Sequence, residues 1–296
     1  MDHQLSRLWL FAALSTQCVA SLAQEVEPIW DIAVGGVDTV FLEELTAGEI
    51  ASAIRDGSTS VIVATGGLEQ NGPNVATGKH DFVLRVMTDS IARAYGDTLV
   101  SSIVQFVPEG SIDPPSGHMK MPGTISLRQS TFEALLTDIC QSLKQHGFED
   151  IFLLGDSGGN GEGMQKVADS LNAEWNDARA HHIAAYYEED LWSYDYLKAL
   201  GIVQQPDELT AFRNNIHTDL VYESVMAIVD PQLVRAKSRL ASGEFSVHGV
   251  QFESAEAMQD VGRKIVEYRT KITVRAMREA AKDQGHSRAL TPPVSS

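Results

Sequence analysis

The hydrophobic pattern between about residues 37 and 187 alternates between two kinds of segment. Short apolar runs predict strands at residues 60–64, 99–104, 151–154 and 183–187. Between them, apolar residues recur every three to four positions, which predicts helices at residues 45–56, 82–95, 130–146 and 161–176. Alternating strands and helices are typical of βαβ units. We therefore expect an α/β protein with a mainly parallel sheet.

The pattern changes after residue 187 but gives no reason to divide the chain. Helical periodicity returns at residues 220–229, and a long amphipathic helix is expected at about residues 254–282. The last residues contain glycine, two prolines and serines, a composition that favours disorder. We expect one domain over residues 24–284 and a disordered tail over residues 285–296.

The first 23 residues have the pattern of a secretory signal peptide. Arg7 precedes an apolar stretch at residues 8–20, and the small residues of Ala20-Ser21-Leu22-Ala23 then form a cleavage site. The apolar stretch is too short to span a bilayer. We expect an exported protein, secreted or periplasmic, with a cleavable signal at residues 1–23.

The net charge and the cysteine content limit which partners the chain can bind and how its fold can be stabilised. The formal net charge is −17, and no basic run interrupts the acidic surface, which disfavours nucleic acid and membrane surfaces as partners. Only Cys140 lies beyond the predicted signal, so no internal disulfide is expected. Stability must come from the apolar core.

Two polar loops directly follow predicted strands. Residues 69–81 carry carboxylate, amide and imidazole groups, and residues 155–160 form a glycine-rich loop with Asp156 and Ser157. In open α/β sheets, ligands bind in the crevice beyond the carboxyl ends of the strands. We therefore expect a functional site formed by these two loops.

The order of motifs in the chain resembles that of the creatininase family over about residues 61–235. The matching motifs are Glu-Gln-x-Gly-Pro at 69–73, His118 before Pro-Gly-Thr-Ile-Ser at 122–126, Gly-Phe-x-x-Ile at 147–151 and Gly-Gly-Asn at 158–160. The resemblance implies a three-layer α/β/α sandwich with one or two divalent metals, zinc, manganese or iron. It also implies that metal-activated water hydrolyses a C–N bond of a small cyclic or linear amide, in a homo-oligomer that is commonly a hexamer.

The metal ligands implied by the resemblance must be carried over position by position. Glu69 matches the family glutamate, but Asn71 stands where the family has histidine, and His80 stands where it has aspartate. Ser157 replaces a later histidine, although the neighbouring Asp156 can supply an oxygen ligand. Because a catalytic metal needs three protein ligands and an open position, we expect a site made by Glu69, His80 and Asp156, with His217 as the alternative to Asp156.

Further site residues follow from the same resemblance. The segment at residues 217–224 resembles a family segment with a histidine and a glutamate, which implies His217 as general acid with Glu223 as its carboxylate partner, Asp219 being an alternative. The positions expected to contact the substrate are His118, Ser157, Gly158, Gly159 and Asn160.

Two other functions remain compatible with the residues. Residues 155–159 have the Gly-x-Ser-x-Gly spacing of a nucleophile elbow, so Ser157 with His217 as base would make a metal-free serine hydrolase. Alternatively, the altered ligand positions would leave a non-catalytic binding protein that keeps the fold. Ser157→Ala would abolish a serine enzyme and spare a metal enzyme.

Overall fold

A four-stranded parallel sheet forms the centre of the molecule. The computed structural model describes residues 36–188, 190–205 and 219–283. The strands lie in the order β2-β1-β3-β4, and every neighbouring pair is parallel. Their bounds are Ser60–Thr65 (β1), Thr98–Val100 (β2), Asp150–Gly155 (β3) and Arg179–His182 (β4).

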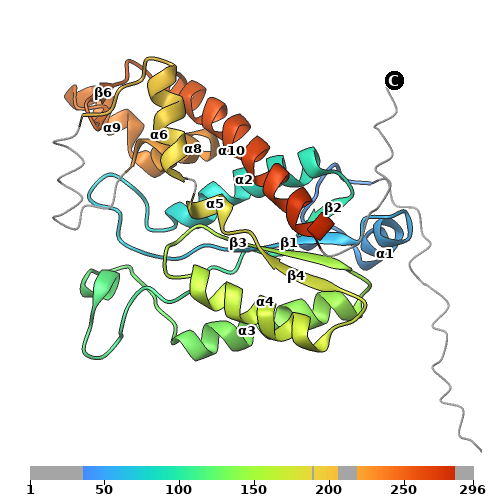
Figure 1. Ribbon diagram of the computed structural model, residues 1–296. Coiled ribbons are helices and arrows are strands. Elements are labelled where there is room, and N and C mark those ends of the chain that lie inside the picture. The colour runs from blue at the N-terminus through green and yellow to red at the C-terminus, as the bar shows by residue number, and fades with distance from the viewer. Residues whose placement is uncertain (1–35, 189, 206–218, 284–296) are drawn as a thin grey trace, which may run out of the picture.

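Helices cover both faces of the sheet (Figure 1). Helices α2 (Lys79–Tyr95), α8 (Leu220–Val229) and α10 (Ala255–Asp283) pack on one face, and α3 (Gln129–Gln145) and α4 (Gly161–Glu174) pack on the other. This arrangement confirms the prediction of a three-layer α/β/α sandwich. The remaining elements are η1 (Leu42–Glu44), α1 (Ala47–Arg55), η2 (Gly117–Lys120), α5 (Ala185–Glu188), α6 (Asp190–Ala199), η4 (Pro231–Val234), α9 (Ala236–Ser242), β5 (Ser246–Val247) and β6 (Val250–Gln251).

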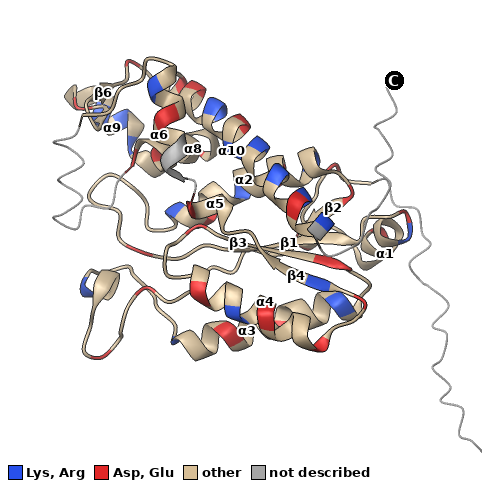
Figure 2. Ribbon diagram, viewed as in Figure 1, with Lys and Arg blue, Asp and Glu red and all other residues tan. Residues whose placement is uncertain are grey.

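The central strands β1 and β3 are apolar between their ends because both of their faces are covered. In β1, Ile62 and Ala64 belong to the core under α2, α8 and α10, whereas Val61 and Val63 belong to the core under α3 and α4. Cys140 packs in the second core as a small apolar residue, and burial raises the pKa of its thiol to about 12. Charged residues lie mainly on the helices, and α10 carries residues of both signs along its length (Figure 2).

Two strand predictions were wrong in position. The last strand is Arg179–His182 rather than residues 183–187, which lead into α5. Strand β4 lacks the apolar pattern of a buried strand, because polar residues such as His181 have partners in the fold. The His181 ring stacks on Phe152, and His181 Nε2 lies 2.8 Å from Asp150 Oδ1. Strand β2 ends at Val100, and only an isolated bridge continues the predicted run as far as Val104.

Several predictions concern residues outside the described ranges. The signal peptide at residues 1–23 and the tail at residues 285–296 both lie there, so both stay predictions. Among the described residues, no helix combines the length and the hydropathy needed to cross a bilayer.

Candidate metal centre

The candidate site lies beyond the carboxyl ends of β1 and β3, where three loops meet. The residues of the Pro-Gly-Thr-Ile-Ser motif join two of these loops. Ile125 N donates to Leu68 O (3.0 Å), and Ser126 Oγ accepts from Glu109 N (2.9 Å). The motif thereby sets the position of both Glu69 and Glu109, which explains why it accompanies the glutamate loop in the sequence.

Glu69 is the centre of the site and is 1% exposed. Its Oε1 lies 3.1 Å from Lys79 Nζ and 2.9 Å from His80 Nε2, and its Oε2 lies 3.1 Å from His118 Nε2. Lys79 and His80 are the first residues of α2, so the positive end of that helix also faces the carboxylate. The loop keeps its shape through Asn71, whose Nδ2 donates to the carbonyls of Glu69 and Ala76.

His80 connects the two strand-end loops. Its Nε2 faces Glu69 and its Nδ1 lies 2.9 Å from Asp156 Oδ2, while its ring packs edge-on against Tyr222 at 5.5 Å. Burial and the charge of Lys79 lower its pKa, but the hydrogen bonds of Asp156 and Glu69 and the charge of Asp156 outweigh them and raise the pKa of His80 overall. The imidazole therefore bridges two acids, one from each loop.

The site contains more buried acid than its cations neutralise. Burial, followed by the like charge of Glu69, raises the pKa of Glu109 to about 8, and burial raises the pKa of Asp81 to about 6. Glu109 Oε1, Asp81 Oδ2 and Asp156 Oδ1 are buried without a hydrogen-bond partner among the described residues. Because a buried unpaired polar atom is costly, these oxygens indicate a place for a cation.

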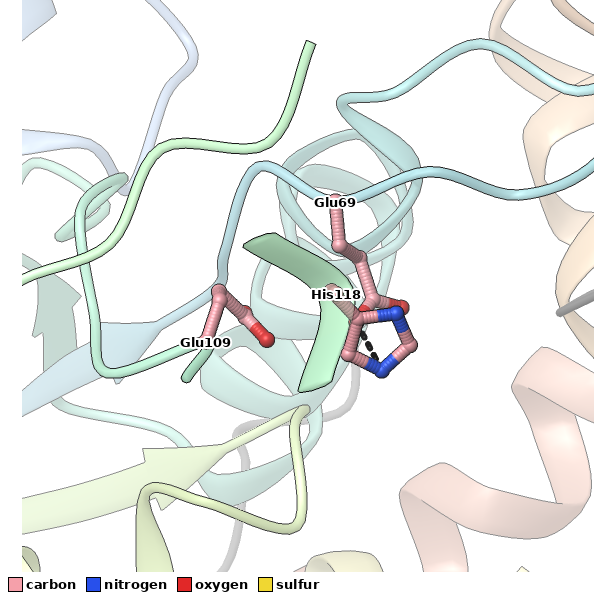
Figure 3. A group of neighbouring side chains, drawn as sticks. All are labelled: Glu69, Glu109 and His118. Atoms are coloured by element: carbon pink, nitrogen blue, oxygen red, sulfur yellow. Dashed lines mark ion pairs between the residues drawn. The ribbon is translucent and has the colours of Figure 1, made fainter. Parts of the chain in front are cut away.

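Glu69, Glu109 and His118 converge on one point (Figure 3), and one potential ligand atom of each lies within 4.8 Å of the other two. Two carboxylates and an imidazole suit zinc, manganese or iron and leave positions open for water and substrate. Since Glu109 Oε1 has no partner among the described residues, this oxygen is available to a divalent ion. A candidate metal centre is therefore present in the fold.

The structure brings the predicted ligands Glu69, His80 and Asp156 together, but as a hydrogen-bonded chain in which His80 uses both ring nitrogens. Of these three, only Glu69 belongs to the converging group. His118, expected as a substrate contact, belongs to it as well. Glu109 was not predicted from the sequence. Like Glu69, Glu109 follows a mainly apolar run, at residues 103–107, and lies next to a glycine, Gly110, so the same pattern could have identified it.

The glycine-rich loop after β3 packs against the end of β1. Asn160 Nδ2 donates to Thr65 O (3.2 Å), Thr65 Oγ1 (2.9 Å) and Gly66 O (3.1 Å), so this amide is engaged in joining the two strands. A Cβ on Gly159 would lie 2.8 Å from the carbonyl oxygen of Pro108, which requires glycine there. Ser157 and Gly158 line a cavity of about 70 Å³ together with His182 and Tyr187, and none of the three converging residues lines it.

Glu223 is buried and forms an ion pair of 2.6 Å with Arg239, which also donates to the carbonyl oxygens of Val234 and Ser246. Burial raises the pKa of Glu223 despite this partner. His217, expected to act with Glu223, lies outside the described residues.

Two glycines after β1 let acids approach the backbone closely. A Cβ on Gly66 would lie 2.0 Å from Asp81 Oδ1, and a Cβ on Gly67 would lie 2.1 Å from Glu109 Oε1. Gly67 also has φ +148°, which other residues rarely adopt. The two glycines therefore make room for the carboxylates of the centre.

A parallel sheet of this topology between two layers of helices, with a carboxylate and imidazole centre at its carboxyl edge, defines an α/β/α-sandwich protein with a candidate metal site. The chain belongs to the creatininase family, because the family model described as creatinine amidohydrolase matches residues 43–281. Membership confirms the resemblance seen in the sequence and the prediction of a creatininase-like hydrolase.

Relatives with solved structures share this fold. The crystal structure of a creatinine amidohydrolase aligns with TM-score 0.54 and 19% identity over 85% of this chain and 100% of that one. A creatininase of the Zn-Zn type gives 0.54 and 19% over 84% and 99%, and a manganese creatininase gives 0.53 and 19% over 83% and 98%. At these identities the likeness shows the fold alone.

A curated relative extends the comparison to another hydrolase. The 3-dehydro-scyllo-inosose hydrolase of Thermotoga maritima is 26% identical over 128 residues, which are 43% of this chain and 37% of that protein. The match thus spans little more than a third of that relative's length.

Proposed function

We propose that this chain is a metal-dependent hydrolase that cleaves a C–N bond of a small cyclic or linear amide at the centre made by Glu69, Glu109 and His118. The observation that carries the proposal is the convergence of these three side chains around a buried carboxylate oxygen, Glu109 Oε1, that has no partner among the described residues. The names of the related proteins, creatinine amidohydrolase and 3-dehydro-scyllo-inosose hydrolase, support a hydrolytic role.

The residues around the centre hold the ligands in place. Lys79 and His80 both contact Oε1 of Glu69 and so leave its Oε2 directed toward His118. His118 is 29% exposed, whereas Glu69 is 1% exposed, so the centre opens to solvent on the His118 side. A substrate would therefore approach past η2. The bound ion would supply Lewis acidity and activate water.

The identity of the metal is inferred from the donor atoms of the site and from the names of related structures. The mixed nitrogen and oxygen set suits zinc, manganese or iron, and the names of related structures mention zinc and manganese for those proteins. His217 as the acid that protonates the leaving nitrogen, export of the protein and assembly into a homo-oligomer remain part of this proposal.

The first experiment measures metal content and hydrolysis together. Protein purified without chelator is analysed by elemental mass spectrometry and assayed against a panel of lactams, cyclic ureides and linear amides. We expect Glu69→Gln and Glu109→Gln to lose both metal and hydrolysis, and Ser157→Ala, the matched control, to keep both. Protein that binds neither zinc nor manganese, or hydrolysis that depends on Ser157, would contradict the proposal.

A further inference from the structure

Two places beside Glu69 resemble cation sites. On the Oε2 side lie His118 and Glu109, whose ligand atoms converge with that of Glu69. On the Oε1 side lies His80, which continues to Asp156. Asp156 Oδ1 is buried and has no hydrogen-bond partner among the described residues, so the second place also has unused ligand capacity. The geometry of the acids alone would thus allow two ions.

Lys79 distinguishes the two places. Its Nζ lies 3.1 Å from Glu69 Oε1 and 4.9 Å from the centre of the Tyr222 ring, and the side chain is 2% exposed. A primary ammonium is a compact positive charge, and here the ring face and the carboxylate hold it at the oxygen that a second ion would use. A divalent ion bound to that oxygen would lie close to the buried ammonium, which would repel it strongly.

The charge of Lys79 reaches the whole centre. The pKa of His80, of Glu109 and of Glu223 is raised overall, and the charge of Lys79 partly offsets each of these rises. Glu223 has Arg239 as its direct partner, at 2.6 Å, so Lys79 is not required there. The ammonium therefore acts mainly on the acids around Glu69.

His80 strengthens the same effect. Both of its ring nitrogens are occupied by acids, Nε2 by Glu69 and Nδ1 by Asp156. Ligation of an ion by either nitrogen would break one of these contacts. An ion on the Oε1 side would have to exchange one of these contacts for ligation, whereas Glu109 Oε1 on the other side has no partner among the described residues.

We propose that the Lys79 ammonium takes the place of a second metal ion, so that each chain binds one divalent cation, at Glu69, Glu109 and His118. This inference rests on the proposed metal-dependent function and adds the stoichiometry of the centre and the residue that determines it. Loss of the ammonium would open the place between Glu69, His80 and Asp156 to a second ion.

The test counts bound zinc without reference to activity. Full-length protein is stripped of metal, equilibrated with zinc(II) by dialysis, and analysed by elemental mass spectrometry, with isothermal titration calorimetry on the same samples. The variants are Lys79→Met, which removes the charge, and the double variant Lys79→Met with Asp156→Asn. Lys166→Met is the matched control, because Lys166 forms a surface ion pair with Glu133.

We expect one equivalent of zinc in the unaltered protein and in Lys166→Met, two in Lys79→Met, and one again in the double variant. Two equivalents in the unaltered protein, or one in Lys79→Met, would overturn the inference and leave the proposed function intact. No bound zinc or manganese in the unaltered protein would instead overturn the proposed function. If Lys79→Met does not fold, Lys79→Gln, which is neutral but still donates to Glu69, gives the same count.

Discussion

Glu109→Gln tests the electrostatics of the centre in the metal-free protein. The Glu109 carboxyl has an ordinary pKa of 4.5, and burial beside Glu69 raises it to about 8 in the folded chain. Folding thus favours the protonated acid, and stability from this group is present below pH 4.5 and is lost as the pH rises through 8. Glutamine imitates the protonated acid, because its amide also donates a hydrogen bond, but it does not titrate.

The magnitude follows from the pKa. Each pKa unit is worth about 1.4 kcal/mol, so ionisation of Glu109 lowers the stability of the metal-free protein by about 4 kcal/mol between pH 5 and pH 9. Other groups titrate over this range, but they do so in both proteins. Glu109→Gln is therefore expected to gain about 4 kcal/mol of stability relative to the unaltered protein over the same interval.

The assay is urea unfolding with chelator present, followed by circular dichroism at pH 5, 7 and 9. With saturating zinc the difference should reverse, because the unaltered protein gains binding energy that the variant cannot. If the two proteins keep a constant difference in unfolding free energy across the three pH values, the proposed burial of an acidic pair at Glu69 and Glu109 is wrong.

Three further changes test other parts of the site. Asn160→Ala removes the donor to Thr65 and Gly66 and should lower the unfolding free energy by about 2–3 kcal/mol in urea titrations; an unchanged value would show that the amide contacts do not matter. Gly67→Ala places a methyl group against Glu109 and should weaken zinc binding by calorimetry, whereas Gly57→Ala, with open space, should not. Arg239→Met leaves Glu223 buried without its ion-pair partner and should cost about 3–5 kcal/mol in thermal unfolding. Adding Glu223→Gln should recover part of that loss, and no recovery would contradict the pairing.

The sequence predicted those parts of the fold that depend on local pattern. Strand β1 is apolar at every position except its ends because both faces are buried, and the long helix α10 follows a regular amphipathic period. The position of strand β4 was not predicted because its polar residues are paired with residues of the neighbouring strand β3, as His181 is with Asp150. That pairing depends on two residues far apart in the chain, so no local pattern reveals it.

The centre was predictable only in part for a similar reason. Glu69 stands at a strand end within a recognisable motif, and its place could be read from the chain. Glu109 follows no regular strand, and it reaches the site only because Ser126 and the motif around it fix its loop. The effect of Lys79 depends on the direction in which the first turn of α2 presents its side chains, which alignment to a family motif does not show.

The hydrogen bonds of Asn160 also bear on how this centre could be moved into another scaffold. The amide ties the loop after β3 to the last residue of β1, so one side chain and the pairing of the two strands together hold the two loops at a fixed separation. A designer who grafts the loop sequences alone would transfer Glu69 and Asp156 without their spacing. Asn160 and Thr65 would have to be transplanted as a pair, together with the adjacent parallel strands that present them.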